Sequence, residues 1–545
     1  MKSAYHFSAL TLAALAVCSG SASAITFETE SLSGSLDSTV TTGIGLRAKN
    51  PSCNLIVTGA SGSGAPAGCT TAAGVGDQGN LNYAKGDAFT TYLKGTHELL
   101  LKMPDDVKFM GRVTWLRDLS ATQTTGYTSA ATGSNGYTNS LSPEARDDLN
   151  FKARLLDFWV SKEFTLGEER ARVRVGNQVI SWGESIFLPG GLNQTNSMDI
   201  MRASQPGTQL KEVFLPAPMI SFATGLGHGL NFEAYLQTRW NESYFPPTGS
   251  YWSQVNGLGK GDTTYGYARN KPKNSGQYGA ALRWQPADTQ PNLGLYTMAY
   301  HDKVPQLSLA NGTEWVYPED RHMYGVSANM PVGDWSLGSE LSYRPKDAVS
   351  LNPNFDGCAG NGGKCWVDEK KYQWHMTGML SMTPSSDYGN VLKALGNAST
   401  ATLMIEGVAA YYPSMKKYYG SEPVGAGVWG WGQEYNLNGT AQSVGNKLSA
   451  GYNLDFSWVY DGSLIAGWQV MPEVYFFHAV KGRTPNSSAL FMQGAKSANF
   501  MITFTQNPAN WQFGVNYAKF WGGSSVFDQP YKDRDFVGLY ASRNF

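Results

Sequence analysis

Residues 107–115 read VKFMGRVTW, and their side chains alternate in character. In an extended chain the apolar or small residues share one face (Val107, Phe109, Gly111, Val113 and Trp115), and the other face carries Lys108, Met110, Arg112 and Thr114. Such alternation predicts a β-strand with one apolar and one polar face. The turn signal Pro104-Asp105-Asp106 stands directly before it, which predicts a tight connection to a preceding strand.

The same period of two recurs along the chain. Residues 170–176 set three arginines against Ala171, Val173 and Val175, and residues 231–240 and 511–518 repeat the pattern. We count about eighteen such segments, near residues 30–47, 87–103, 107–119, 150–164, 170–182, 217–225, 229–241, 276–285, 292–302, 320–330, 334–344, 371–382, 401–412, 443–459, 463–479, 490–505, 510–521 and 533–545.

The connections between these segments alternate between short and long. Tight turns of Pro, Gly, Asn and Asp alternate with long polar stretches near 48–86, 120–149, 183–216, 242–275, 303–319, 345–370 and 413–442, and 383–400 is the main exception. Short turns at one end, long loops at the other and an even strand number are typical of outer-membrane barrels. A solenoid or propeller would need a fixed repeat period, and we find none. The sequence therefore predicts an all-β, transmembrane antiparallel barrel of about 18 strands, with 14 to 18 compatible.

Composition supports this class and excludes others. Charged residues make up 16% of the 545 residues, against about 25% in soluble domains, and aromatic residues make up 13%. Mean hydropathy is −0.31, and beyond the N-terminus no apolar run is long enough to span a membrane as a helix. The net charge of −1 offers no basic surface for nucleic acid.

The N-terminus predicts export. Lys2, the apolar stretch 7–17 and the A-x-A site Ala22-Ser23-Ala24 form the pattern of a secretory signal peptide, residues 1–24, with cleavage after Ala24. The barrel would then occupy 25–545 in the bacterial outer membrane, in contact with its lipid. The chain ends on an alternating strand with Phe545, which resembles the signal read by the barrel assembly machinery, although Arg543 stands where an aromatic residue is more usual.

Four cysteines remain after the signal peptide, and four cysteines allow three pairings. Local pairing, Cys53–Cys69 and Cys358–Cys365, closes two short Gly-rich loops in an oxidising compartment. A metal site is a weaker interpretation, because the spacings are not C-x₂-C and no histidine lies near either pair. We therefore predict two disulfides in extracellular loops, no metal and no cofactor.

The inward faces of the strands carry the first candidate site. Early strands place basic side chains inward (Lys108, Arg112, Lys152, Arg154, Arg170, Arg172 and Arg174), and later strands place acidic ones inward (Glu340, Glu406, Asp455 and Glu473), with Glu233 between. One hypothesis is that these charges segregate and set up a field across the lumen that selects solutes. The alternative is that they pair across neighbouring strands and merely satisfy a polar interior.

The connection 183–216 is the second candidate site. It combines apolar residues with Pro and Gly, and a loop of this kind is poorly suited to water. Folding into the barrel would bury side chains such as Phe187 and Phe214, each worth about 2 kcal/mol. We predict that this loop is a gate formed by Ile186, Phe187, Leu188, Asp199, Arg202 and Phe214; packing on the rim is the alternative.

Several stretches, in order, resemble a known family. They are VGNQVISWGESIFLPGGL at 175–192, LKEVFLPAPMI at 210–220, YFPPTGSYWS at 244–253, GQYGAALRW at 276–284 and DRDFVGLYASRNF at 533–545. They are similar to the domain-of-unknown-function 1302 family of Gram-negative outer-membrane β-barrel proteins. The resemblance implies an outer-membrane barrel and, as partners, an RND-type inner-membrane transporter and a periplasmic protein. It implies hydrophobic or amphipathic small molecules as cargo, and it supplies no catalytic residues.

The function predicted from the sequence is passage of small, hydrophobic or amphipathic molecules by diffusion through the outer membrane, without energy input by this chain. The first alternative is a closed barrel that serves as the outer-membrane docking component of RND-linked lipid or amphiphile traffic, and the second is a surface adhesin. An outer-membrane enzyme is disfavoured, because the chain has no G-x-S-x-G or H-E-x-x-H motif.

Overall fold

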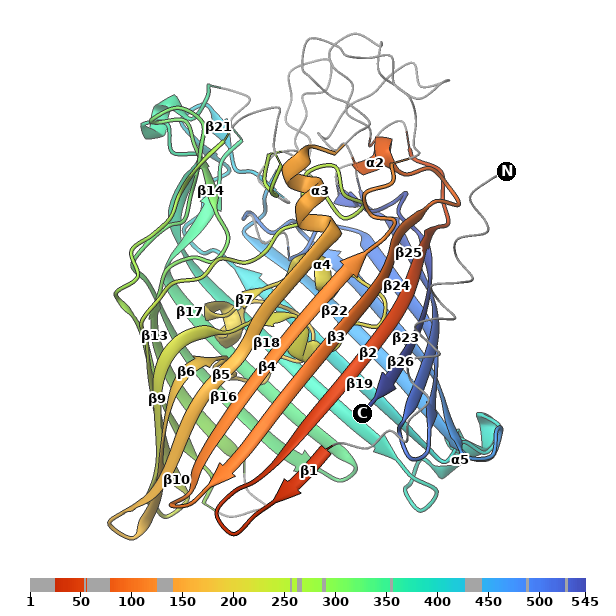
Figure 1. Ribbon diagram of the computed structural model, residues 1–545. Coiled ribbons are helices and arrows are strands. Elements are labelled where there is room, and N and C mark those ends of the chain that lie inside the picture. Colours follow the sequence, from red (N-terminus) through yellow and green to blue (C-terminus); the bar gives the residue numbers. More distant parts are fainter. Residues whose placement is uncertain are drawn as a thin grey trace.

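The computed structural model describes residues 25–52, 55, 79–124, 141–254, 257–261, 267–286, 291–352, 356–426, 444–486, 490–524 and 528–545. Within these ranges eighteen long antiparallel strands form one closed barrel, as the sequence predicts (Figure 1). The predicted signal peptide, 1–24, and Cys53 and Cys69 lie outside the described residues.

The barrel strands follow chain order around the wall: β2 (Ser33–Arg47), β3 (Ala88–Met103), β4 (Val107–Asp118), β5 (Phe151–Leu166), β6 (Glu169–Gln178), β9 (Ala217–Gly227), β10 (Leu230–Gln237), β12 (Gln277–Trp284), β13 (Asn292–Tyr300), β16 (Arg321–Val332), β17 (Trp335–Ser350), β18 (Trp366–Met382), β19 (Thr400–Tyr411), β22 (Leu448–Asp461), β23 (Trp468–Lys481), β24 (Ala495–Gln506), β25 (Trp511–Gly522) and β26 (Phe536–Asn544).

The barrel closes between its last and first strands. β26 pairs antiparallel with β2 from Thr39 opposite Asn544 to Arg47 opposite Phe536. The short strand β1 (Ile25–Glu28) pairs with the beginning of β2, residues 33–36. It lies on the same side of β2 as β26, which pairs with residues 39–47. Every barrel strand therefore has a hydrogen-bonded neighbour on both sides, which removes the open edges of the sheet.

The outward face of the wall is apolar. Exposed apolar side chains recur on strands all around the barrel, among them Val113, Phe158, Val175, Ile220, Leu236, Leu282, Leu295, Val326, Leu341, Trp374, Phe500, Val515 and Leu539. They alternate with polar side chains that point inward, because successive side chains of a strand point to opposite faces. In the part of the chain described here, no helix is long and apolar enough to cross a membrane.

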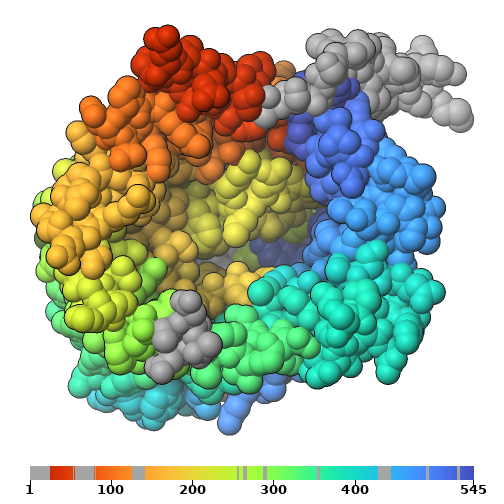
Figure 2. Space-filling view, turned by 90° about the horizontal axis from the view of Figure 1, so that it is seen from below, coloured from red at the N-terminus to blue at the C-terminus, as the bar shows by residue number. Residues whose placement is uncertain are grey.

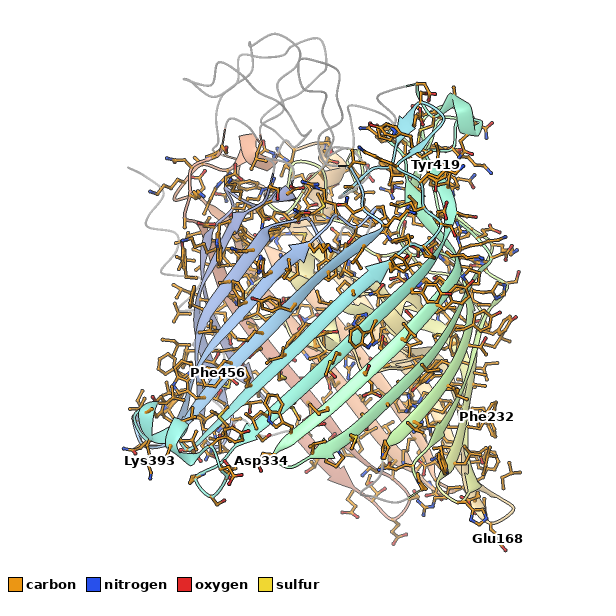
Figure 3. All side chains as sticks on the ribbon, turned by 180° about the vertical axis from the view of Figure 1, so that it is seen from behind. Glu168, Phe232, Asp334, Lys393, Tyr419 and Phe456 are labelled. Atoms are coloured by element: carbon orange, nitrogen blue, oxygen red, sulfur yellow. A yellow bond between two sulfur atoms is a disulfide. The ribbon has the colours of Figure 1, made fainter. Side chains whose placement is uncertain are left out.

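The two ends of the barrel differ in the length of their connections. Tight turns join most strand pairs at one end, where Asp105, Asp106 and Gly333 take positive φ angles. The exception is the longer connection with helix α5 (Gly389–Ala394), which the sequence also indicates. Figure 3 labels Glu168, Asp334 and Lys393 at this short-turn end and Tyr419 at the opposite, long-loop end.

The long-loop end carries a lobe that the sequence analysis did not predict in full. Strands β17 and β18 extend past the predicted limits, 344 and 371, and pair as far as Ser350 opposite Trp366. A disulfide between Cys358 and Cys365 closes the tip of this hairpin, which confirms one predicted pairing. Apolar side chains of this hairpin and of neighbouring long loops, including Val349, Leu351 and Trp315, bury one another in the lobe and make the extension stable.

Candidate functional site

The connection between β6 and β9, residues 183–216, lies inside the barrel, and we call it the lumen loop. Figure 2, viewed from the short-turn end, shows a hollow ring that contains yellow atoms from this part of the chain. Two short strands form its neck, β7 (Ser197–Met198) and β8 (Phe214–Leu215). Beyond the neck it divides into a first lobe, residues 183–192, and a second lobe, residues 199–212.

Glu340 of β17 holds the first lobe at two points. One carboxylate oxygen accepts the backbone N–H of Glu184 at 2.7 Å, and the other accepts that of Leu192 at 3.0 Å. Two glycines make this approach sterically feasible, because a Cβ at Gly183 or Gly191 would lie about 2 Å from the same carboxylate. Both glycines have positive φ angles, which side chains disfavour. Gly183 and Gly191 therefore allow the first lobe to lie directly against Glu340 on the barrel wall.

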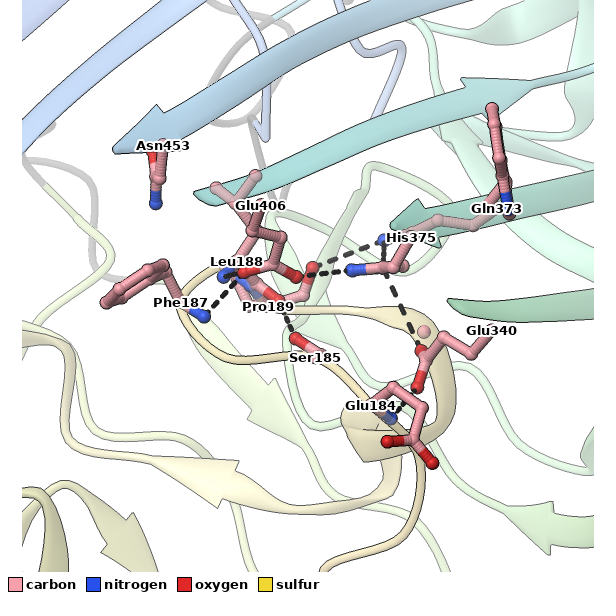
Figure 4. Close-up of polar contacts among 12 residues, drawn as sticks. Glu184, Ser185, Phe187, Leu188, Pro189, Glu340, Gln373, His375, Glu406 and Asn453 are labelled. Atoms are coloured by element: carbon pink, nitrogen blue, oxygen red, sulfur yellow. Dashed lines mark hydrogen bonds and ion pairs between the residues drawn. The ribbon is translucent and has the colours of Figure 1, made fainter. Parts of the chain in front are cut away.

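Glu406 of β19 holds the tip of the first lobe. One of its oxygens accepts the backbone N–H groups of Phe187, at 2.5 Å, and Leu188, at 2.9 Å. Its other oxygen contacts Nδ1 of His375 at 2.7 Å, and the side-chain amide of Gln373 lies 2.8 Å from Nε2 of the same ring (Figure 4). Glu340, His375 and Glu406 are all at most 1% exposed, so the anchor is shielded from water.

The apolar tip of the first lobe packs across the lumen. Phe187 lies edge-on to Tyr475 of β23, with ring centroids 5.6 Å apart. Leu188 is buried among Val408 and Ala479 of the far wall and Phe491 of the connection between β23 and β24. Ile186 is 39% exposed. The first lobe therefore bridges from its own side of the barrel to β17–β23.

The second lobe reaches the wall formed by β3, β5 and β26. Asp199 pairs with Arg154 of β5 and caps helix α4 (Ile200–Ala203) by accepting the backbone N–H of Arg202. Glu212 accepts from Lys94 at 2.6 Å and from Thr96 at 2.9 Å, both on β3, and lies 3.5 Å from Arg202. This lobe is thus fixed by buried ion pairs.

The tip of the second lobe touches the barrel seam. Tyr92 donates to the carbonyl of Pro206 at 2.7 Å, and the Pro206 ring lies against Gly538 of β26. The lumen loop is therefore tied to two well-separated parts of the wall and crosses the lumen between them.

Of the six residues predicted as a gate, Phe187 and Leu188 form the tip of the first lobe. Asp199 and Arg202 hold the second lobe in place, and Phe214 belongs to the neck.

The structure gives most of the predicted basic lumen residues a local partner. Lys108 pairs with Glu163 at 2.7 Å, Lys152 with Asp148 at 2.7 Å, and Arg112 with both Glu98 and Asp157. The Arg174 guanidinium lies 4.1 Å from the centroid of the Trp159 ring. This is the local pairing that the sequence left open, and it weakens any field from Lys108, Arg112 and Lys152. The Trp159 ring is neutral and leaves the charge of Arg174 in place. Arg170 and Arg172 are exposed and have no ion pair among the described residues.

The predicted acidic lumen residues are also engaged. Glu233 accepts from the indole of Trp182 at 2.7 Å and lies 3.5 Å from Arg283. Asp455 and Glu473 lie on the adjacent strands β22 and β23, where their carboxyl groups interact with each other. Glu340 and Glu406 hold the lumen loop, so most of the predicted acidic side chains interact with other groups of the protein.

Sequence reasoning missed the side chains that complete the two anchors. They are Lys94, Glu212, Gln373 and His375. Two signals were available: Glu212 stands inside the quoted stretch 210–220, and His375 and Gln373 alternate inward with Thr377 on β18. Neither signal identifies a partner, because partners distant in sequence meet only after the barrel closes. Among the described residues no group of three or more His, Cys, Asp or Glu side chains is placed to hold a metal ion.

Comparison with solved structures finds remote similarity to bacterial proteins, one of which is described as an outer membrane protein. OccAB1 of Acinetobacter baumannii is 11% identical, with 94% of this chain and 96% of that chain covered and a TM-score of 0.44. OpdK of Pseudomonas aeruginosa, crystallised with vanillate, is 10% identical, with coverage of 94% and 98% and a TM-score of 0.40. Similarity this remote transfers no substrate to the present chain.

Comparison with curated proteins finds no match. A family model described as "Protein of unknown function (DUF1302)" matches residues 6–545. Because that match spans nearly the whole sequence, the chain belongs to the domain-of-unknown-function 1302 family.

Proposed function

We propose that this protein is an outer-membrane channel through which small molecules diffuse, and that the lumen loop sets the width of the passage. The observation that carries the proposal is the course of this loop. It is tied to Glu340 and Glu406 on one part of the wall and to Lys94 and Arg154 on another. A loop fixed in this way narrows a water-filled barrel at a constant place.

The exterior of the barrel supports placement in a membrane. Exposed apolar side chains surround a closed sheet whose inward face is polar. Only closed barrels and helices satisfy all backbone hydrogen bonds in lipid. Together with the signal pattern at 1–24, this supports export and insertion into the outer membrane.

Amphipathic solutes are the cargo that we propose. The family resemblance implies such molecules. The lumen offers charge for the polar part of such a solute, because Arg170 and Arg172 are exposed on β6. The aromatic cluster of Trp182, Tyr235 and Tyr296 is buried and offers no surface to a solute. The proposal needs no catalytic residue and no cofactor. The periplasmic partner and the RND-type transporter remain part of it, as proteins that would deliver or receive the solute.

Single-channel recording tests the proposal. We expect the purified, folded barrel to give stable, ohmic openings in a planar bilayer, and proteoliposomes that contain it to take up small amphipathic solutes. A folded barrel that carries no current would contradict the channel. That result would favour the alternative, a closed barrel that docks a periplasmic partner, and co-purification with that partner would be the next measurement.

A further inference from the structure

A hollow of about 400 Å³ lies on the inner wall near the short-turn end of the barrel. Residues of β5, β6, β9, β10, β12 and β13 line it, including Arg170, Arg172, Arg283, Glu233 and Asn231. Figure 3 labels Phe232, another lining residue, on β10 near this end. We call it the mouth pocket. None of its lining residues is an anchor of the lumen loop.

The strand register creates the mouth pocket. Arg172 of β6 lies opposite Ala223 of β9, and Ala223 lies opposite Glu233 of β10. One step nearer the mouth, Asn231 lies opposite Arg283, which in turn lies opposite Gly294 of β13. Small residues thus stand between long charged ones. Because the small side chains do not fill the space above the barrel wall, the charged side chains around them enclose a hollow.

Two of the guanidinium groups in the mouth pocket are available to a ligand. Lys108 neutralises Glu163 at 2.7 Å, and Arg283 lies 3.5 Å from Glu233. The Glu169 carboxylate lies against Gly225 at the edge of the pocket. Arg170 and Arg172 have no hydrogen bond or ion pair within the described ranges, and both are exposed, although Glu163, the partner of Lys108, lies opposite Arg172 in the strand register. With Lys108 included, the pocket has four cationic and three anionic side chains.

We propose that the mouth pocket binds the carboxylate group of a small solute. Arg170 and Arg172 are two residues apart on one strand and so point to the same face. Guanidinium groups bind a planar carboxylate with two parallel hydrogen bonds. The volume is in the range of small-ligand sites. The inference rests on the proposed channel, because it names the chemistry of the solute that the lumen would admit.

Calorimetric titration of the full-length barrel in detergent with benzoate tests the proposal. We expect benzoate to bind at low ionic strength and benzyl alcohol, which is neutral and similar in shape, not to bind. The double variant R170Q/R172Q should weaken benzoate binding at least about tenfold, since each lost charge-assisted contact is worth roughly that factor. The control is R117Q, because Arg117 is also an exposed arginine and lies on β4 at the long-loop end.

Equal benzoate affinity in the wild type and the double variant would overturn the proposal, as would a folded wild type that binds no benzoate. Inorganic phosphate is titrated in parallel, and binding of phosphate without benzoate would show that the assigned ligand is wrong. If the double variant does not fold, R172K keeps the charge without the planar fork and should still weaken binding. Because binding is measured without current, a barrel that conducts but does not bind contradicts only the pocket, and one that binds but does not conduct contradicts only the channel.

Discussion

Gly191 shows how a single residue can fit the lumen loop to the wall. It has a φ of +56°, and an added Cβ would lie 1.9 Å from the nearer carboxylate oxygen of Glu340. Gly333 has nearly the same φ, +58°, but it lies in a turn where an added Cβ would meet nothing within 4 Å. Alanine substitutions at the two positions therefore separate the free-energy cost of a left-handed backbone from the cost of losing the contact with Glu340.

We predict that Gly191→Ala increases the single-channel conductance, because its methyl group pushes the first lobe away from Glu340. Gly333→Ala should leave conductance unchanged. Both variants should lower the free energy of unfolding by about 1 kcal/mol for the backbone strain alone, and Gly191→Ala should lower it further. Equal conductance in the two variants would argue against the role given to Glu340.

Lys303 gives the protein a pH-dependent stability. It follows β13 in a long loop, and burial lowers its pKa to about 7 from 10.5. The folded state therefore holds the amine neutral over an interval in which the unfolded state holds it charged. Because the unfolded state binds more protons there, the free energy of unfolding decreases as the pH falls from about 10.5 to about 7.

We predict that Lys303→Met raises the midpoint of thermal unfolding more at a pH of about 7.5 than at a pH of about 10. The variant also loses hydrogen bonds to Gln277 and Asn241. The loss of these hydrogen bonds affects stability at both pH values. The measured quantity is therefore the difference between the two pH values in the midpoint shift that the substitution causes. A shift of the same size at both would contradict the assigned pKa.

The sequence indicated which side chains point inward, but it did not indicate what they hold. Alternation placed Glu340 and Glu406 on the inner face, because a period of two is local information. These two carboxylates accept backbone N–H groups of residues 184–192, which lie about 150 to 220 positions away in the chain. Partners at that separation cannot be derived from the spacing of residues.

Among the elements, the limits of most strands were predictable, but the extent of the hairpin of β17 and β18 was not. Strand limits such as 107–119 for β4 agree with Val107–Asp118, because the turn residues punctuate the chain clearly. The hairpin of β17 and β18 extends further than predicted, since its alternation breaks where the register shifts between Arg344 and Asp347. The extension is supported by neighbouring loops, for example by Glu422, which accepts the backbone N–H of Cys358 at 2.6 Å.

We predict that C358S/C365S loosens the tip of this hairpin without affecting the channel. The disulfide joins residues seven positions apart, and loss of so short a closed loop costs about 2 kcal/mol. Limited proteolysis should cleave the variant faster between 351 and 365, while conductance stays the same because the hairpin lies beyond the lumen loop. Altered conductance with unchanged proteolysis would contradict this separation.

At the scale of the whole molecule, closure depends on the last strand. Phe545 and Ser38 exchange backbone hydrogen bonds of 2.8 and 3.2 Å, and the Arg543 guanidinium lies 5.3 Å from the Phe545 ring. Phe545→Ala keeps these backbone bonds, so we predict little change in the stability of the purified barrel. If the ring is the signal for the assembly machinery, the yield of folded barrel in cells should fall severalfold. Phe513→Ala, which removes another phenylalanine ring from a barrel strand, is the control, and equal yields would contradict the assembly role.

The molecule as a whole is a polar-lined barrel crossed by one loop. Most of the charges predicted to form a field across the lumen are paired with neighbours or hold the loop. Charge free to act on a solute is concentrated in the mouth pocket at Arg170 and Arg172. Selection by size and selection by charge would therefore occur at two different depths of the same passage.

The central claim, that the lumen loop limits the passage, is tested most directly by comparing single-channel conductance of the wild type with that of a variant lacking residues 186–214. The barrel wall should persist, because water can solvate Glu340, Glu406 and Lys94 once the loop is gone. We predict a conductance several times that of the wild type, with unchanged strand content by circular dichroism. The same conductance from an equally folded deletion variant would contradict the account.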